Sequence, residues 1–235
     1  MTVPQLLPTA VHPLSGHRPY ETVGVAGEET TFARMANDLL QHGYSITPNA
    51  FPVTLASALL LEIQQVPDSI FARGGVGRQN HRTRNKGVRR NDILWIGGET
   101  AAQRQWLAWT ALLQTCLNRT LLLGLFSFES HFSRYRPGDF YKIHRDAFKG
   151  QANRVLSVVA YLNPNWVPED AGELVIYADT GSDIVARVAP LSGTLAVFLS
   201  EDFPHEVLAT KNNRYSVTGW YRVNNSTGSR LDPPR

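Results

Sequence analysis

The spacing of hydrophobic residues changes near Gly124. Before it, apolar residues recur every three or four positions in three segments, a pattern that predicts amphipathic helices. The first helix is expected between a cap at Thr30 and a stop at Gly43, the second begins near Pro52, and the third begins at Thr100. The residues expected to face the core are Phe32, Met35, Ala36, Leu39, Leu40, Leu55, Leu59, Ile63, Trp106, Leu113 and Leu117.

After Gly124, apolar and polar residues alternate in short runs, which is typical of β-strands. Turn-forming pairs such as Pro137-Gly138 and Ser192-Gly193 separate these runs. Many short strands at this spacing favour a sandwich or barrel, of which the jelly roll is one solution. Because the helices precede most of the strands, we predict an α+β fold with N-terminal helices supporting a sheet. The expected strands are 44–47, 91–96, 126–129, 140–144, 155–162, 173–177, 184–188, 194–198 and 214–223.

Composition bounds the class of protein. We predict one domain over 29–223, between a flexible arm (1–28) and a flexible tail (224–235), and a hydrophobic fraction of 43% is enough for a buried core. The single cysteine, Cys116, excludes an intramolecular disulfide and fits a reducing, cytoplasmic compartment. No segment approaches the roughly 18 uninterrupted apolar residues of a membrane span, so no membrane association is expected.

Two histidines and one aspartate can share a metal ion in this predicted sheet. His144 and Asp146 are two positions apart, and residues at that spacing on a strand point to the same face. His205 is the best third ligand, because it follows the apolar strand 194–198 through a short polar turn. Two histidines and one carboxylate form the facial triad of non-haem iron(II) oxygenases, which leaves coordination positions open for other ligands.

Arg214 begins a strand that is otherwise rich in Val, Thr, Trp and Tyr. A buried charge without a partner is very costly, and a planar guanidinium is suited to bidentate binding of a carboxylate. We therefore expect Arg214 to hold a carboxylate ligand. The alternative is an arginine on an edge strand that pairs with a protein acid such as Glu173.

Seven basic residues and no acidic residue lie between positions 73 and 90. Such a block is typical of a solvated loop. A nucleic-acid partner is disfavoured, because the segment lacks the aromatic residues on which bases stack.

The candidate ligands stand within longer motifs. The chain resembles the prolyl 4-hydroxylase branch of the 2-oxoglutarate oxygenases over roughly residues 30–223, in particular the hypoxia-factor prolyl hydroxylases and their bacterial relatives. This resemblance implies a double-stranded β-helix (jelly-roll) core. The motifs are Arg90-Asn-Asp92-Ile-Leu-Trp95, Tyr135-Arg-Pro-Gly-Asp-Phe-Tyr141-Lys-Ile-His144-Arg-Asp146, Tyr161-Leu-Asn163, Gly172-Glu-Leu174, Pro204-His205-Glu206 and Arg214-Tyr-Ser-Val-Thr-Gly-Trp220.

The resemblance also implies a role for each matching residue. His144, Asp146 and His205 would ligate Fe(II), and together with Arg214 they would form the catalytic set. Arg214 and the phenol of Tyr161 would bind the distal carboxylate of 2-oxoglutarate.

The remaining assignments concern the walls of the site. Tyr135 would lie beside the co-substrate, and Trp220 would wall the pocket near His205. Arg90 and Asp92 match positions that contact the substrate polypeptide, beside a loop that closes over it. The alternative for the aromatic residues is that they are large core side chains, and we interpret His131 as structural.

The activity implied is an Fe(II)- and 2-oxoglutarate-dependent dioxygenase that hydroxylates C4 of a prolyl residue in an intracellular protein. It would consume O₂, release succinate and CO₂, and take ascorbate as a candidate reductant. The basic loop suggests that the substrate presents an acidic surface. Two alternatives stay open, namely a hydroxylase of a small molecule and a non-catalytic basic binding protein. The sequence leaves the oligomeric state undetermined.

Overall fold

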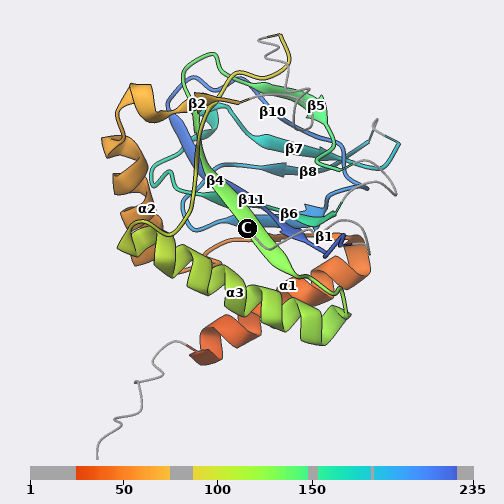
Figure 1. Cartoon of the computed structure of the whole chain (residues 1–235). Helices are drawn as coiled ribbons and strands as arrows, with labels where there is room; N and C mark the ends of the chain where they lie inside the picture. Colours follow the sequence, from red (N-terminus) through yellow and green to blue (C-terminus); the bar gives the residue numbers. More distant parts are fainter. Residues whose placement is uncertain (1–24, 75–86, 148–152, 181–182, 227–235) are drawn as a thin grey trace, which may run out of the picture.

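The computed structural model describes residues 25–74, 87–147, 153–180 and 183–226, which form three layers (Figure 1). Three helices cover one face of a seven-stranded sheet, and a four-stranded sheet packs against its other face. The helices are α1 (Val25–His42), α2 (Val53–Gln65) and α3 (Ala101–Leu121). In Figure 1, α1 and α3 lie at the bottom of the view and the smaller sheet at the top.

Both sheets are antiparallel throughout their described pairings. The order in the large sheet is β1 (Tyr44–Thr47), β9 (Leu195–Leu199), β6 (Arg154–Tyr161), β11 (Arg214–Arg222), β4 (Ser127–Tyr135), β3 (Asp92–Trp95) and β2 (Ala72–Arg73). The order in the small sheet is β5 (Tyr141–His144), β10 (His205–Val207), β7 (Leu174–Tyr177) and β8 (Ile184–Val188). Short 3₁₀ helices lie at Asp68–Ile70 and Pro168–Asp170. The predicted α+β fold with a jelly-roll core is confirmed.

The central strands are buried on both faces, and their side chains alternate between two cores. In β6, Val158 and Ala160 belong to the core beneath the helices, whereas Val159 and Tyr161 belong to the core between the sheets. Successive residues of a strand point to opposite faces, so a continuous apolar run supplies both layers.

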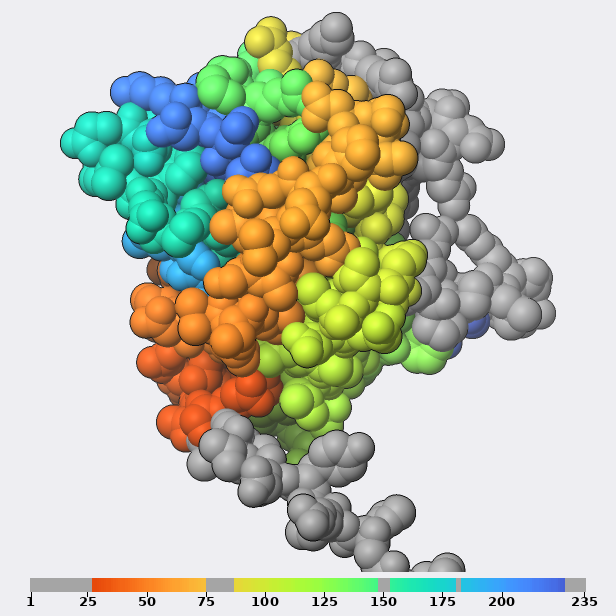
Figure 2. Space-filling model, turned by 90° about the vertical axis from the view of Figure 1, so that its left-hand side faces the viewer, coloured from red at the N-terminus to blue at the C-terminus, as the bar shows by residue number. Residues whose placement is uncertain are grey.

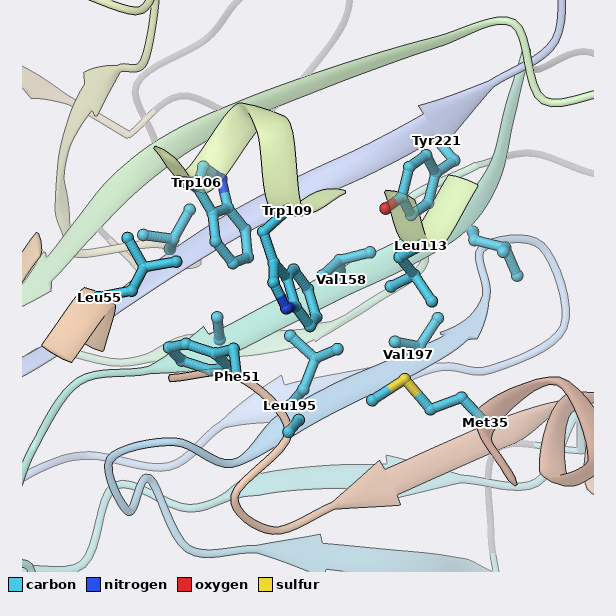
Figure 3. Close-up of a cluster of buried hydrophobic side chains, with 14 of the residues drawn as sticks. Met35, Phe51, Leu55, Trp106, Trp109, Leu113, Val158, Leu195, Val197 and Tyr221 are labelled. Carbon is cyan, nitrogen blue, oxygen red and sulfur yellow. The ribbon is translucent and has the colours of Figure 1, made fainter. Parts of the chain in front are cut away.

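Aromatic side chains of α3 form the centre of the core beneath the helices (Figure 3). Trp106 and Trp109 stack with ring centroids 5.7 Å apart, and Phe51 meets both rings edge-on. The indole N–H of Trp106 donates to Ser130 Oγ of β4 at 3.2 Å, so the helix also makes a polar contact with the sheet. This packing fixes α3 against the strands that carry the site.

The start of α3 is set by side-chain capping. Thr100 Oγ1 accepts from the backbone N–H of Gln103 at 3.1 Å, as an N-cap residue does. The side chains of Thr100 and Gln103 also donate to the carboxylate of Glu62 on α2, which ties the two helices together. Figure 2 shows the resulting outer surface, with α2 in orange beside α3 in yellow-green and α1 in red below them.

Some element boundaries differ from the sequence-based expectation. The first helix begins at Val25, so Thr30 lies inside it and not at its cap, and the helix includes the last four residues of the predicted arm. Glu28 lies in the first turn, where a negative charge is favourable. The assignment of Thr30 as the cap did not take Glu28 into account. Leu40 was expected in the core but is 69% exposed. The rest of the predicted arm, residues 1–24, and most of the tail lie outside the described residues.

Two short strands were not predicted. The strand β2 has two residues and β10 has three, lengths at which alternation carries no signal. His205 follows the apolar strand β9 through a short turn, as expected, and begins β10 in the other sheet. Within the described part of the chain, no helix is both long and apolar enough to cross a membrane.

Two adjacent leucines on α3 test the packing of this layer. Leu113 is completely buried, whereas Leu112 is 56% exposed. We expect Leu113→Ala to lower the free energy of unfolding by about 2–5 kcal/mol, because it leaves a cavity in the core. Leu112→Ala should change that free energy by less than about 0.5 kcal/mol. Urea denaturation measures both, and equal effects would contradict the described orientation of α3.

Candidate active site

A cavity opens between the two sheets. Residues of both sheets line it, so it depends on the packing of one sheet against the other. The lining residues are Arg89, Ser133, Tyr135, Tyr141, His144, Asp146, Val159, Leu174, His205, Val207, Arg214, Ser216, Thr218 and Trp220.

His144, Asp146 and His205 meet in this cavity with geometry suited to a metal ion. One ligand atom from each of the three lies within 4.8 Å of the others. His144 Nε2 is 3.5 Å from Asp146 Oδ1, and His205 Nε2 is 3.6 Å from Asp146 Oδ2. The two histidines are paired partners on the neighbouring strands β5 and β10. Strand register therefore brings together ligands that lie 61 positions apart in the printed sequence.

Backbone carbonyls orient both imidazoles. His144 Nδ1 lies 2.8 Å from Lys142 O, and His205 Nδ1 lies 3.0 Å from Phe203 O. A carbonyl can only accept, so each Nδ1 donates to it, and in the neutral ring the lone pair is then on the Nε2 that faces the cluster. This is the outer-shell arrangement typical of histidine ligands to metals.

The protonation states also favour metal binding. Burial lowers the pKa of His205 to about 4, so its imidazole is neutral at physiological pH. Burial opposes ionisation of Asp146, but the neighbouring His205 and His144 hold its pKa well below the usual range. Ser157 Oγ donates to Asp146 Oδ2 at 2.8 Å and also contacts Ser200 Oγ at 2.9 Å. An ionised, oriented carboxylate with imidazole nitrogens is a donor set that fits Fe(II).

Arg214 lies in the same cavity and is only 1% exposed. Its Nε donates to Gly172 O at 2.8 Å and its Nη1 to Ser216 Oγ at 3.4 Å. Within the described part of the chain, Nη2 has no hydrogen-bond partner and no carboxylate pairs with this guanidinium. The alternative in which Glu173 neutralises Arg214 is therefore wrong.

Two phenols flank the guanidinium of Arg214. Its Cζ lies 5.0 Å from the ring centroid of Tyr135 and 5.2 Å from that of Tyr161. The buried hydroxyl of Tyr161 also has no hydrogen-bond partner among the described residues. Burial raises the pKa of this phenol, so it is a neutral donor. Buried polar groups are almost always hydrogen-bonded, and two unsatisfied donors side by side mark a binding site for an acceptor.

Trp220 forms part of the cavity wall that also carries the metal-ligand cluster, and His131 packs against Trp220. Trp220 is 5% exposed, lines the cavity, and packs under Arg154, whose Cζ is 3.6 Å from its ring centroid. His131 is 2% exposed and lies between Trp220 and Trp95, with ring centroids 5.5 and 5.2 Å away. Its Nδ1 contacts Ser133 Oγ at 3.2 Å. These contacts agree with the structural interpretation of His131.

Arg90 and Asp92, expected to contact substrate, do not line the cavity. Arg90 packs over the ring of Phe140 at 5.1 Å. Asp92 is 3% exposed and pairs in the sheet with Arg134, whose side chain points away from the face that carries Tyr135.

The carboxylate of Asp92 is instead held by a network of charges. It forms ion pairs of 2.8 to 3.3 Å with three arginines, and Asp68 joins two of them. The arginines are Arg73, Arg134 and Arg136. This network anchors β2 and β3, the strands on either side of the 75–86 segment, which lies outside the described residues.

Sequence reasoning missed three residues of the site. Tyr141 stacks on His144 with ring centroids 3.5 Å apart, and Arg89 lies over the same ring at 4.6 Å. Ser157 orients Asp146 from β6. Tyr141 was inside a recognised motif and three residues before a ligand, which was the available signal. The sequence carries no such signal for Ser157, because the position of Ser157 relative to Asp146 depends on how the two sheets pack.

Known proteins share this arrangement. Residues 130–222 match the sequence profile of the 2OG-Fe(II) oxygenase superfamily. A solved prolyl-4-hydroxylase of Pseudomonas putida is 36% identical, with a TM-score of 0.73, over 82% of this chain and 98% of that protein. A prolyl hydroxylase of Trichoplax adhaerens, solved with a hypoxia inducible factor peptide fragment, is 24% identical with a TM-score of 0.74. That match covers 87% of this chain and 94% of that one, and it shows the fold.

A curated relative gives a weaker match. The human prolyl hydroxylase EGLN3 is 26% identical over 160 residues, which make up 63% of this chain. The chain spans 62% of the length of that relative.

The hydroxyl of Ser157 tests the orientation of the metal-ligand cluster. We expect Ser157→Ala to weaken binding of a divalent metal by about 10- to 100-fold, because it removes an outer-shell bond to Asp146. Ser216→Ala is the matched control, since that hydroxyl lines the same cavity but contacts Arg214. Calorimetric titration with Mn(II) measures both affinities. Equal losses in the two variants would show that the Ser157 contact is not specific to the metal site.

The buried His131 predicts a pH dependence of stability. Burial lowers its pKa to about 3, whereas the unfolded chain has a histidine pKa of about 6.5. Between these values the unfolded state binds the additional proton, so stability falls as pH falls. This residue contributes up to about 1.4 kcal/mol per pH unit. Urea denaturation at several pH values between 7 and 5 gives the free energy of unfolding as a function of pH. This free energy should depend less steeply on pH in His131→Phe than in wild type, and identical pH dependences would refute the assignment.

Proposed function

Because the chain belongs to the 2OG-Fe(II) oxygenase superfamily, we propose that it hydroxylates C4 of a prolyl residue in a protein substrate. The reaction consumes 2-oxoglutarate and O₂ and releases succinate and CO₂, and one oxygen atom of O₂ becomes the new hydroxyl. The prolyl-4-hydroxylase of Pseudomonas putida, alignable over nearly its full length, supports the choice of reaction.

The observation that carries this proposal is the pair of unsatisfied buried donors beside the His-Asp-His cluster. Arg214 Nη2 and Tyr161 Oη need an acceptor, and a carboxylate satisfies a guanidinium with the strongest hydrogen bonds available. A dicarboxylate such as 2-oxoglutarate can place one end here and its other end at the metal. Neither the small-molecule alternative nor the non-catalytic one accounts better for these groups.

Each residue then has a defined task. His144, Asp146 and His205 hold Fe(II), and their prior orientation by Lys142 O, Phe203 O and Ser157 limits reorganisation when the ion binds. Bound iron supplies the oxidative chemistry by which O₂ and 2-oxoglutarate together convert a C–H bond into a C–OH bond.

Apolar neighbours keep water from the reacting groups. Val159, Leu174 and Val207 line the cavity that also holds the proposed metal and co-substrate sites. Excluding water strengthens the electrostatic contacts of Arg214 and protects reactive species from side reactions. Trp220 closes the wall beside the cluster.

We propose a polypeptide as substrate for two reasons. The Trichoplax adhaerens relative was solved with a peptide fragment, and in this chain the strand β5, which carries His144 and lines the cavity, consists of half-buried and exposed residues. The single cysteine, Cys116, supports a reducing, cytoplasmic setting.

Variants of the co-substrate site test the activity. With Fe(II), ascorbate, air and 2-oxoglutarate, wild type should release succinate and His144→Ala should not. Arg214→Met should raise the KM for 2-oxoglutarate by about 100-fold, because it removes charge-assisted bonds worth roughly 3 kcal/mol. Tyr161→Phe removes one bond and should raise it by about 10-fold. Arg187→Met removes a charge from the exposed strand β8 and should keep the wild-type KM.

The same pair of proteins identifies the substrate class. Mass spectrometry of lysate treated with wild type, compared with His144→Ala, should show a prolyl peptide that gains one oxygen. Undiminished succinate release by His144→Ala would remove the metal assignment. Oxygen gained by a metabolite and by no protein would replace the prolyl substrate with a small molecule.

A further inference from the structure

The cavity is lined by two arginines in different surroundings. Arg214 is 1% exposed and is the residue proposed to bind the co-substrate. Arg89 is only half-buried and is therefore more accessible to solvent. The resemblance to known hydroxylases pointed to the neighbouring Arg90, which does not line the cavity. The role of the Arg89 guanidinium is therefore a separate question.

Arg89 lies one aromatic ring away from a proposed metal ligand. His144 covers one face of the Tyr141 ring at 3.5 Å between centroids, with the planes only 16° apart. Arg89 Cζ lies over the same ring at 4.6 Å, so it must occupy the opposite face. Through these two contacts Arg89 Cζ lies at most about 8 Å from the His144 ring, a distance that two residues of extended chain at about 3.3 Å each, together with an acidic side chain, can span.

The position of Arg89 is fixed by its own segment. The backbone beside it pairs with β5, since Arg90 N donates to Phe140 O and Lys142 N donates to Val88 O, both at 2.9 Å. Its Nε donates to Asn91 Oδ1 at 2.6 Å. Gly74 leaves room for this side chain, because a methyl group there would collide with Arg89 Nε and Asn91 Oδ1. A guanidinium held in this way loses little conformational entropy when it binds a ligand.

We propose that Arg89 binds an acidic side chain of the substrate polypeptide next to the residue that is hydroxylated. This inference rests on the proposed function and names a specificity-determining residue for it. A guanidinium is planar and matches a carboxylate with two parallel hydrogen bonds, so aspartate or glutamate within two positions of the target proline is the expected partner. Because Arg89 is half-buried, its charge is screened less than that of a fully exposed arginine.

Matched peptides test this proposal. The full chain is loaded with Mn(II) and 2-oxoglutarate, and binding of fluorescent proline peptides is followed by anisotropy. The peptides carry Glu, Gln or Lys at one position, scanned over the two residues on each side of proline. At one of these positions, wild type should bind the Glu peptide about tenfold more tightly than the Gln peptide, as expected for one partly buried charge pair.

Five variants distinguish an effect of Arg89 on peptide preference from an effect of the net charge of the protein. Arg89→Gln should bind Glu and Gln peptides equally, Arg89→Lys should keep part of the preference, and Arg89→Glu should prefer the Lys peptide. Gly74→Ala should weaken the preference, because the added methyl group displaces the guanidinium. Arg187→Gln, which removes the same charge from an exposed position on β8, should keep it. The Kd for 2-oxoglutarate should stay at the wild-type value in all five, which checks that the fold is intact.

The outcomes distinguish this inference from the proposed function. Peptides that bind and become hydroxylated without any preference for Glu would overturn the role of Arg89 alone. An equal loss of preference in Arg187→Gln and Arg89→Gln would also overturn it, because net charge would then be the cause. Failure of wild type to bind any proline peptide would overturn both the peptide substrate and this inference.

Discussion

The alternation of side chains across β11 is the constraint on which the rest of the structure depends. Its even-numbered residues Arg214, Ser216, Thr218 and Trp220 line the cavity, while Val217 and Tyr221 belong to the core beneath the helices. A strand places neighbours on opposite faces, so the same nine residues supply a polar wall and an apolar one. A shift of register by one residue would exchange the two and bury the site against the helices.

Burial of the apolar face of the large sheet offsets the free-energy cost of burying polar groups on its other face. Burying the unmatched donors of Arg214 and Tyr161 costs free energy, of the order of 1–3 kcal/mol for each unsatisfied group. The Trp106 and Trp109 cluster on the other side of the sheet offsets that cost, since a fully buried aromatic side chain contributes several kcal/mol when measured against alanine. A ligand that satisfies the donors would recover part of the cost, which couples occupancy of the site to stability.

Local patterns predicted most of the fold and the core of the site. Helical spacing located α2 and α3, and the His-x-Asp spacing located His144 and Asp146, although Asp146 lies just beyond the end of β5 and not on it. The strand β10 that His205 begins was not predicted, since a three-residue strand carries no periodic signal.

Contacts set by packing of distant strands could not be predicted. Ser157 and Arg89 owe their places to the meeting of the two sheets and to pairing beside β5. Resemblance pointed to Arg90, whereas the adjacent Arg89 lines the cavity, because neighbouring residues of an extended chain point in opposite directions. Arg90 packs on Phe140, while the adjacent Arg89 enters the cavity.

The two cavity arginines show how burial separates the roles of one residue type. Arg214, enclosed between two phenols, can accept only a small carboxylate that enters the cavity. Arg89, stacked on Tyr141 and half-buried, can meet a carboxylate carried by a larger molecule that remains outside. The metal-ligand cluster lies in the same cavity as both, so in the proposed reaction one charge would select the co-substrate and the other the polypeptide. Chemistry and recognition would therefore be joined through the Tyr141 ring, which contacts His144 of the cluster and Arg89.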